Sequence, residues 1–133
     1  TKGTLVLNYR FDPAVALQQF RDTRPVYMAG PATAFTALLA QPDFTPDDFS
    51  SFRSIMSGGA PLPEGLVKKF EERAGVYVGQ GYGLTETSAQ CITVPHWLRA
   101  PVDPESGNLS CGLPSVEAHV RIAREDGVRL RPR

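Results

Sequence analysis

The sequence predicts an α/β fold in which helices alternate with the strands of a parallel sheet. Three observations support this prediction: short apolar runs recur along the chain, helical apolar patterns separate them, and glycine or proline turns join the two. The expected strands are residues 4–8, 26–29, 52–56 and 76–80. Because a helix is expected between each pair of strands, the chain is predicted to form βαβ units.

Each helix is predicted from its start signal and from the spacing of its apolar residues. Asp12 with Pro13, Gly30 with Pro31, and Pro63 mark the three starts, since Asp caps a helix and Pro suits its first turn. The residues that recur at helical spacing are Leu17, Phe20, Phe35, Leu38, Leu39, Leu62, Leu66, Phe70 and Ala74. We expect them to face the core.

The last third of the chain has a different pattern. Residues 95–114 are interrupted by proline and show no sustained period, which predicts a long irregular connection. Residues 116–122 alternate apolar and polar side chains, which predicts a strand with one wet face in a second sheet. Asp126 and Gly127 are typical of a hairpin turn that would follow it.

The composition excludes several classes of protein. Fourteen basic and fourteen acidic residues give a net charge of zero, so no global field favours nucleic acid or an anionic membrane. No apolar run is long enough to span a bilayer and no secretory signal opens the chain, so a cytoplasmic location is expected. The two cysteines, Cys91 and Cys111, are expected to be reduced and structural. An apolar sheet face left uncovered could drive oligomerisation.

Residues 81–87 combine the side chains that a bound nucleotide and its metal require. Tyr82 can lay a flat ring against a purine, and the flanking glycines allow the backbone to approach a ligand closely. Thr85 can bond to a phosphate oxygen, and Glu86 offers the hard oxygen that Mg²⁺ prefers. The alternative is a tight turn in which Thr85 or Thr87 caps the next element and Glu86 is simply solvated.

A second glycine motif lies upstream, at residues 57–62, between an expected strand and an expected helix. Both motifs therefore follow the carboxyl ends of strands that we expect to be neighbours. Open α/β sheets bind ligands at that edge. The alternative interpretation of Gly58 and Gly59 is a strained connection needed only to reverse the chain.

The runs SGGAPL at 57–62 and QGYGLTET at 80–87 resemble the adenylate-forming, AMP-binding superfamily, of the acyl-CoA synthetase or fatty-acid-CoA ligase type. Weaker matches extend to residues 11–13, 26–33 and 111–114. The resemblance implies that Tyr82 stacks on adenine, Thr85 binds phosphate and Glu86 binds metal, with Thr85 and Glu86 catalytic. The implied nucleotide-binding residues are Gly59, Ala60, Pro61, Gln80, Gly81, Tyr82 and Thr85. The implied acyl-binding residues are Ser57, Gly58, Gly83, Leu84 and Ala89.

The resemblance also predicts how much of the family's large domain these residues represent. The family's phosphate loop with its Lys, its Tyr-x-x-Gly-Asp block and its small C-terminal domain have no counterpart in these residues. We therefore expect residues 1–133 to be a single segment of a larger N-terminal AMP-binding domain, inactive when alone.

The implied reaction of the whole enzyme joins a carboxylic acid to AMP, with release of pyrophosphate, and then passes the acyl group to coenzyme A. ATP and Mg²⁺ are needed for the first step. Fatty, aryl and amino acids all remain open as substrates. One rival is the adenylation domain of a non-ribosomal peptide synthetase, which passes its acyl group to a carrier protein. The other rival is a non-catalytic binding or scaffold piece.

Overall fold

The computed structural model describes residues 3–125 and contains one five-stranded sheet in the order β1-β2-β3-β4-β5. The strands are β1 (Tyr27–Gly30), β2 (Ser54–Ser57), β3 (Val78–Leu84), β4 (Ala89–Thr93) and β5 (Leu113–Pro114). The pairs β1/β2 and β2/β3 are parallel, whereas β3/β4 and β4/β5 are antiparallel. The predicted α/β class with parallel strands is confirmed.

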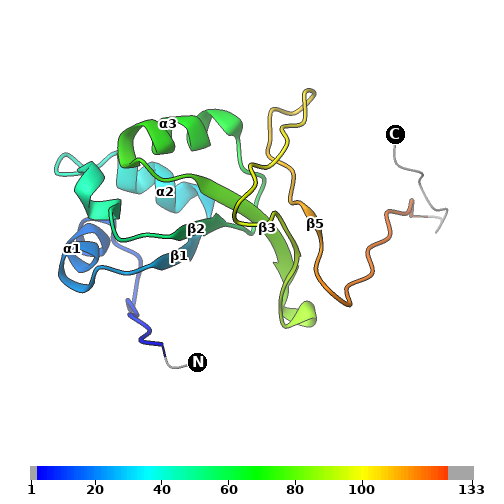
Figure 1. The fold of residues 1–133 in the computed structure, drawn as a ribbon, viewed down its shortest axis with the longest axis horizontal. Helices are drawn as coiled ribbons and strands as arrows, with labels where there is room; N and C mark the ends of the chain where they lie inside the picture. The colour runs from blue at the N-terminus through cyan, green and yellow to red at the C-terminus, as the bar shows by residue number, and fades with distance from the viewer. Residues whose placement is uncertain (1–2, 126–133) are drawn as a thin grey trace.

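In Figure 1, α2 and α3 lie above the parallel strands, and α1 lies at the left, beside β1. The helices are α1 (Pro13–Thr23), α2 (Ala32–Leu39) and α3 (Glu64–Ala74), and two short 3₁₀ turns are η1 (Pro46–Phe49) and η2 (Thr85–Thr87). Asp12 caps α1 as predicted, since its carboxylate accepts bonds from the Ala14 and Val15 N–H groups at 2.9 and 3.1 Å. Pro63 is the N-cap of α3, so this helix begins at Glu64, one residue later than predicted.

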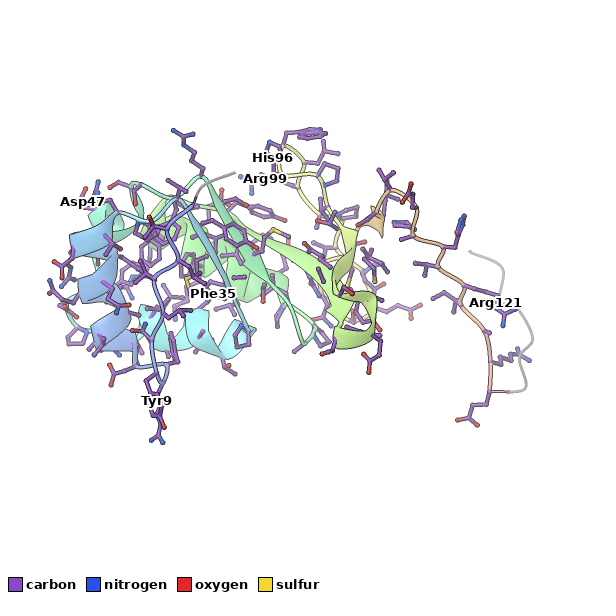
Figure 2. The ribbon with its side chains drawn as sticks, turned by 90° about the horizontal axis from the view of Figure 1, so that it is seen from below. Tyr9, Phe35, Asp47, His96, Arg99 and Arg121 are labelled. Atoms are coloured by element: carbon purple, nitrogen blue, oxygen red, sulfur yellow. The ribbon has the colours of Figure 1, made fainter. Side chains whose placement is uncertain are left out.

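The core is a cluster of phenylalanine rings between the helices and the sheet. Phe49 contacts Phe44, Phe52 and Phe70 with ring centroids 5.1–5.6 Å apart, and Phe35 meets Phe70 edge to face at 5.4 Å. Figure 2 shows Phe35 inside the body of the molecule. The predicted core residues are buried, except for Phe20 and Leu66, which are partly buried.

The two faces of the sheet differ because side chains alternate along each strand. Ile55 and Val78 point toward the helices and are each 1% exposed. Met56 and its register partner Gly79 point to the opposite face, as Ala29 does beside Met56 on β1. The helices α1, α2 and α3 therefore cover the first face and leave the second one open.

Two predicted strands do not form. Residues 4–8 are irregular, and Leu5 and Leu7 are 78% and 76% exposed. Residues 116–122 are also irregular, with Val116 95% exposed. Their apolar residues suit a strand, but within residues 3–125 no neighbouring strand pairs with either segment, and a strand needs such a ladder to be stable. The hairpin turn predicted at Asp126 and Gly127 lies outside the described residues.

Strand β3 runs further than predicted. Residues 81–84 were expected in a loop, yet they continue β3 and pair with β4 from Gly81↔Thr93 to Leu84↔Ala89, with a register shift after Tyr82. A bulge at this point accommodates the change from regular pairing to the turn. The irregular connection predicted at 95–114 is confirmed apart from β5 and single bridges such as Pro63↔Asn108.

Within the described part of the chain, none of the helices has the length and apolar character needed to cross a membrane.

A buried carboxylate joins α1 to η1. The Asp48 side chain is 2% exposed and receives bonds from Arg21 Nε at 2.7 Å and from the Thr45 N–H at 2.8 Å. Arg21 also bonds to Asp43 at 2.8 Å. Burial opposes ionisation of Asp48, but the bonds from Arg21 and Thr45 outweigh it and lower the pKa of the Asp48 carboxyl.

Asp48→Asn is expected to lower the free energy of unfolding at pH 7 by about 1–3 kcal/mol, because Arg21 loses a buried charged acceptor. The pKa of Asp48 lies below its ordinary value of 3.8 in the folded chain, so its contribution is present above that value and is lost as the pH falls through the folded pKa. Urea unfolding at a series of pH values measures both effects. Asp22→Asn, on the exposed side of α1, is the matched control; equal losses in the two variants would contradict the assignment.

Candidate active site

The two glycine motifs meet in space because β2 and β3 are parallel neighbours. Ser57, the last residue of β2, is the register partner of Gln80, which directly precedes the second motif. A Cβ atom placed on Gly58 would lie 3.4 Å from the Gly81 carbonyl oxygen, which is ordinary van der Waals contact. The sheet therefore brings the two motifs together at the edge where the sequence predicted them.

A cleft of about 470 Å³ opens between the motifs on the uncovered side of the sheet. Its lining residues are Tyr27, Ala29, Met56, Ser57, Gly58, Gly59, Gly81, Tyr82, Gly83, Leu84, Thr85, Ser88, Ala89 and Gln90. Most residues of the two predicted sets are therefore gathered in one place. Ala60, Pro61, Gln80 and Glu86 are outside this lining.

Glycine is required at position 83 of the β3–β4 hairpin because the backbone of the neighbouring strand approaches too closely for a side chain. A Cβ atom on Gly83 would collide with the backbone of Ala89 and Gln90, and one on Gly81 would collide with the Gln90 side chain. The floor of the cleft at Gly81 and Gly83 is thus bare backbone partly covered by Gln90. A flat ligand group can approach such a floor closely.

The turn that follows β3 is held by Thr87. Its hydroxyl accepts a bond from the Leu84 N–H at 2.9 Å and lies 2.7 Å from the Ala89 carbonyl oxygen. Thr85 and Glu86 are both exposed, and within residues 3–125 their side chains make no hydrogen bond or ion pair. Thr87 therefore closes the turn, which leaves Thr85 available to a ligand in the cleft.

Two of the predicted residues point away from the cleft. Ser57 and Gln80 are 2% and 4% exposed, on the face of the sheet that the helices cover. Gln80 Nε2 lies 3.5 Å from the Ala60 carbonyl oxygen and 3.6 Å from Cys111 Sγ. The Ser57 hydroxyl and Gln80 Oε1 have no protein partner among residues 3–125. Ser57 can contact a ligand in the cleft only through its backbone. The Gln80 side chain lies on the far side of the first motif, next to the Ala60 carbonyl oxygen.

The side chains of the cleft suit a nucleotide. Tyr82 is 45% exposed and lines the cleft, so part of its ring is open to stacking. Within residues 3–125 no group of three or more His, Cys, Asp or Glu side chains could hold a metal ion by itself. Glu86 next to the cleft still fits Mg²⁺, because this ion often binds through one carboxylate together with substrate phosphates and water.

Several cleft residues were missed by the sequence analysis: Tyr27, Ala29, Met56, Ser88 and Gln90. A period of two along β1 and β2 would have placed Tyr27, Ala29 and Met56 on one face. The sequence contains no signal that this face is the uncovered one, because that depends on where the helices pack.

Comparison with known proteins identifies the family of this chain. The family model described as AMP-binding enzyme matches residues 2–133. A feruloyl-CoA synthase from Amycolatopsis sp is 34% identical over 130 residues, which are 98% of this chain and 25% of that protein. A long-chain-fatty-acid–CoA ligase from Bacillus subtilis (strain 168) is 32% identical over 116 residues, which are 87% of this chain and 20% of that protein.

The fold is shared with solved structures as well. The O-succinylbenzoate coenzyme A synthetase (MenE) from Bacillus subtilis, in complex with ATP and magnesium ion, aligns with a TM-score of 0.68 and 26% identity. That alignment covers 92% of this chain and 23% of the other. The chain thus spans about a quarter of the length of the relatives that it matches. Because the family model extends over nearly all of its residues, the chain belongs to the AMP-binding enzyme family.

Proposed function

We propose that this chain is part of an ATP-dependent acid–CoA ligase and that its cleft holds the acyl-adenylate. The observation that carries the proposal is the meeting of the two glycine motifs beside a cleft that contains Tyr82 and Thr85. The relatives named above support it, because their names are those of CoA synthases and ligases.

The chemistry we propose has two steps. A carboxylate oxygen of the acid attacks the α-phosphorus of ATP, the bond from that phosphorus to the bridging oxygen breaks, and pyrophosphate leaves. The thiol sulfur of coenzyme A then attacks the acyl carbon and AMP leaves. The thiol proton is transferred to solvent or to a base outside the residues described.

The residues of this chain bind and orient the reactants in that scheme. The Tyr82 ring stacks on adenine, and the Thr85 hydroxyl donates a hydrogen bond to a phosphate oxygen. Backbone at Gly58 and Gly83, with Leu84 and Ala89, lines the acyl end of the cleft. Glu86 would hold Mg²⁺, which neutralises phosphate charge when it is bound.

The lack of positive charge in the lining of the cleft limits the chemistry that the 133 residues can perform alone. None of the lining residues named above is Lys or Arg, whereas adenylation develops negative charge on phosphate oxygens. We infer that cationic groups from outside the described residues complete the site, and that this chain is one segment of a larger AMP-binding domain. By itself it is expected not to form an adenylate.

The acceptor and the acid are further parts of the proposal. Coenzyme A is favoured over a carrier protein because the two relatives named above are CoA-dependent by name. Their names include an aryl acid and a long-chain fatty acid, so the identity of the acid is left to experiment. A cytoplasmic location and oligomerisation through the uncovered sheet face stay predictions.

The intact protein, given ATP, Mg²⁺ and a panel of fatty, aryl and amino acids, is expected to release pyrophosphate only when a suitable acid is present. Adding coenzyme A should then yield the acyl thioester. No release with any acid would favour the non-catalytic alternative. Release without thioester formation would instead favour transfer to a carrier protein.

Thr85→Val is expected to lower kcat/KM for pyrophosphate release by about tenfold to a hundredfold, because it removes one hydrogen bond to a charged oxygen worth about 1.5–3 kcal/mol. Val has the same shape, so the turn held by Thr87 should persist. Thr36→Val on the exposed side of α2 is the matched control. Equal rates for the two variants would remove Thr85 from the site.

Glu86→Gln is expected to raise the Mg²⁺ concentration needed for half-maximal rate by about tenfold, a loss of about 1.4 kcal/mol. The substitution removes the carboxylate charge and keeps the size of the side chain. Glu72→Gln, on an exposed position of α3, provides the comparison. An unchanged Mg²⁺ titration for Glu86→Gln would show that Glu86 is only solvated.

A further inference from the structure

Gln80 links the two glycine motifs on the covered side of the sheet. It is 4% exposed, directly precedes Gly81 and is the register partner of Ser57. Its side-chain Nε2 donates to the Ala60 carbonyl oxygen of the first motif at 3.5 Å. The residue that precedes the second motif therefore supports the backbone of the first one.

The Gln80 amide is held weakly, and through its nitrogen alone. Nε2 has two acceptors, the Ala60 carbonyl oxygen at 3.5 Å and Cys111 Sγ at 3.6 Å, and the first distance is long for a bond from N–H to oxygen. Gln80 Oε1 and the Ser57 hydroxyl are buried, and within residues 3–125 neither has a hydrogen-bond partner. Because no short bond fixes the amide, a change at Cys111 is enough to displace it.

The backbone fixes Cys111 on both sides. Before it, the Leu109 N–H donates to the Leu62 carbonyl oxygen at 2.9 Å, so this segment lies beside the amino end of α3 (Figure 1). After it, Gly112 has a φ of +100° and lies so close to β4 that a Cβ atom there would collide with the Thr93 carbonyl oxygen. The segment has little room to move the Cys111 thiol away from Gln80.

We propose that Cys111 is a modification site at which thiol–disulfide exchange weakens the binding of a nucleotide. Cys111 is half-buried, which leaves it partly accessible to a small reagent. A group added to Sγ competes for the space in which the Gln80 amide lies. Gln80 then leaves the Ala60 carbonyl oxygen, and the first motif loses that support. The inference rests on the proposed function, because it takes the two glycine motifs to hold ATP.

The modifying reagent belongs to the class of small disulfides. The Cys111 thiolate attacks one sulfur of the reagent, the S–S bond of the reagent breaks, and the other sulfur leaves as a thiolate. A new S–S bond joins Cys111 to the first sulfur, so the cysteine is oxidised and the departing half of the reagent is reduced. The proton of the Cys111 thiol passes to solvent. An excess of free thiol reverses the exchange.

The test measures the Kd of ATP for the intact protein by calorimetry, before and after treatment with methyl methanethiosulfonate. This probe transfers a methylthio group to a thiolate and releases methanesulfinate. Treatment is expected to raise the Kd by about threefold to tenfold, the effect of losing about one hydrogen bond. Dithiothreitol is expected to restore the original Kd, and mass spectrometry of peptides is expected to locate the added group at Cys111.

Cys111→Met reproduces the modified side chain without a reagent. Methionine is unbranched and has as many heavy side-chain atoms as a cysteine that carries a methylthio group. Its Kd for ATP is expected to match that of the treated wild type. Cys91→Met is the matched control, because Cys91 is also half-buried but lies on β4. That variant is expected to bind ATP as the wild type does.

Two further variants distinguish displacement of Gln80 from a general loss of stability. In a Gln80→Leu background the amide is absent, so Cys111→Met is expected to raise the Kd by less than it does in the wild type. Cys111→Ser keeps an acceptor for Gln80, and it is expected to retain the wild-type Kd after treatment with the probe. Urea unfolding of each variant measures its stability independently of ATP binding.

The outcomes separate this inference from the proposed function. If ATP binds the wild type but neither the treated protein nor Cys111→Met binds it more weakly, the inference about Cys111 is wrong and the ligase proposal stands. Absence of an added group at Cys111, or an equal loss of affinity in Cys91→Met, would also overturn the inference. If the untreated wild type binds no ATP, the proposed function fails and the inference fails with it.

Discussion

The parallel pairing of β2 with β3 is the constraint on which the rest of the site depends. It places Ser57 opposite Gln80, so two glycine motifs separated by a helix in the sequence come into contact at Gly58 and Gly81. The connection between these strands contains α3, whose burial of Phe70 and Ala74 secures it against the sheet. Packing on the helix side therefore fixes the geometry of the cleft on the other side.

The two faces of the sheet have different roles: the covered face packs against the helices, and the uncovered face borders the cleft. On the covered face Ile55 and Val78 belong to the core that contains the phenylalanines, whereas the uncovered face has Ala29, Gly79 and Met56 beside the exposed Tyr27. The apolar surface that stabilises the layers is buried on the covered face, where the aromatic core is continuous. Substitutions on the uncovered face therefore remove less buried apolar surface than substitutions on the covered face do.

The elements that sequence reasoning predicted well are those with local signals. The cap at Asp12 and the helical spacing of Leu17, Phe35 and Phe70 depend on residues close in the chain, and the structure confirms them. The strands predicted at residues 4–8 and 116–122 do not form. A strand needs a neighbouring strand to pair with, and an alternating apolar pattern does not reveal whether one is present. Residues 81–84 form part of a strand that was not predicted. Glycine disfavours strands locally, but here the backbone of these residues pairs with β4. The motif residues were predicted, but Met56 and Gln90 required the packed sheet.

The hairpin leaves part of the second glycine motif without side chains of its own. At Gly81 and Gly83 the motif offers backbone alone, and the side chains that cover this backbone come from neighbouring strands, as Gln90 does from β4. The groups proposed to bind the nucleotide, at Tyr82 and Thr85, thus flank Gly83 and Leu84, which are proposed to border the acyl end. A substitution at Met56 or Gln90 would change the lining of the cleft without altering either glycine motif.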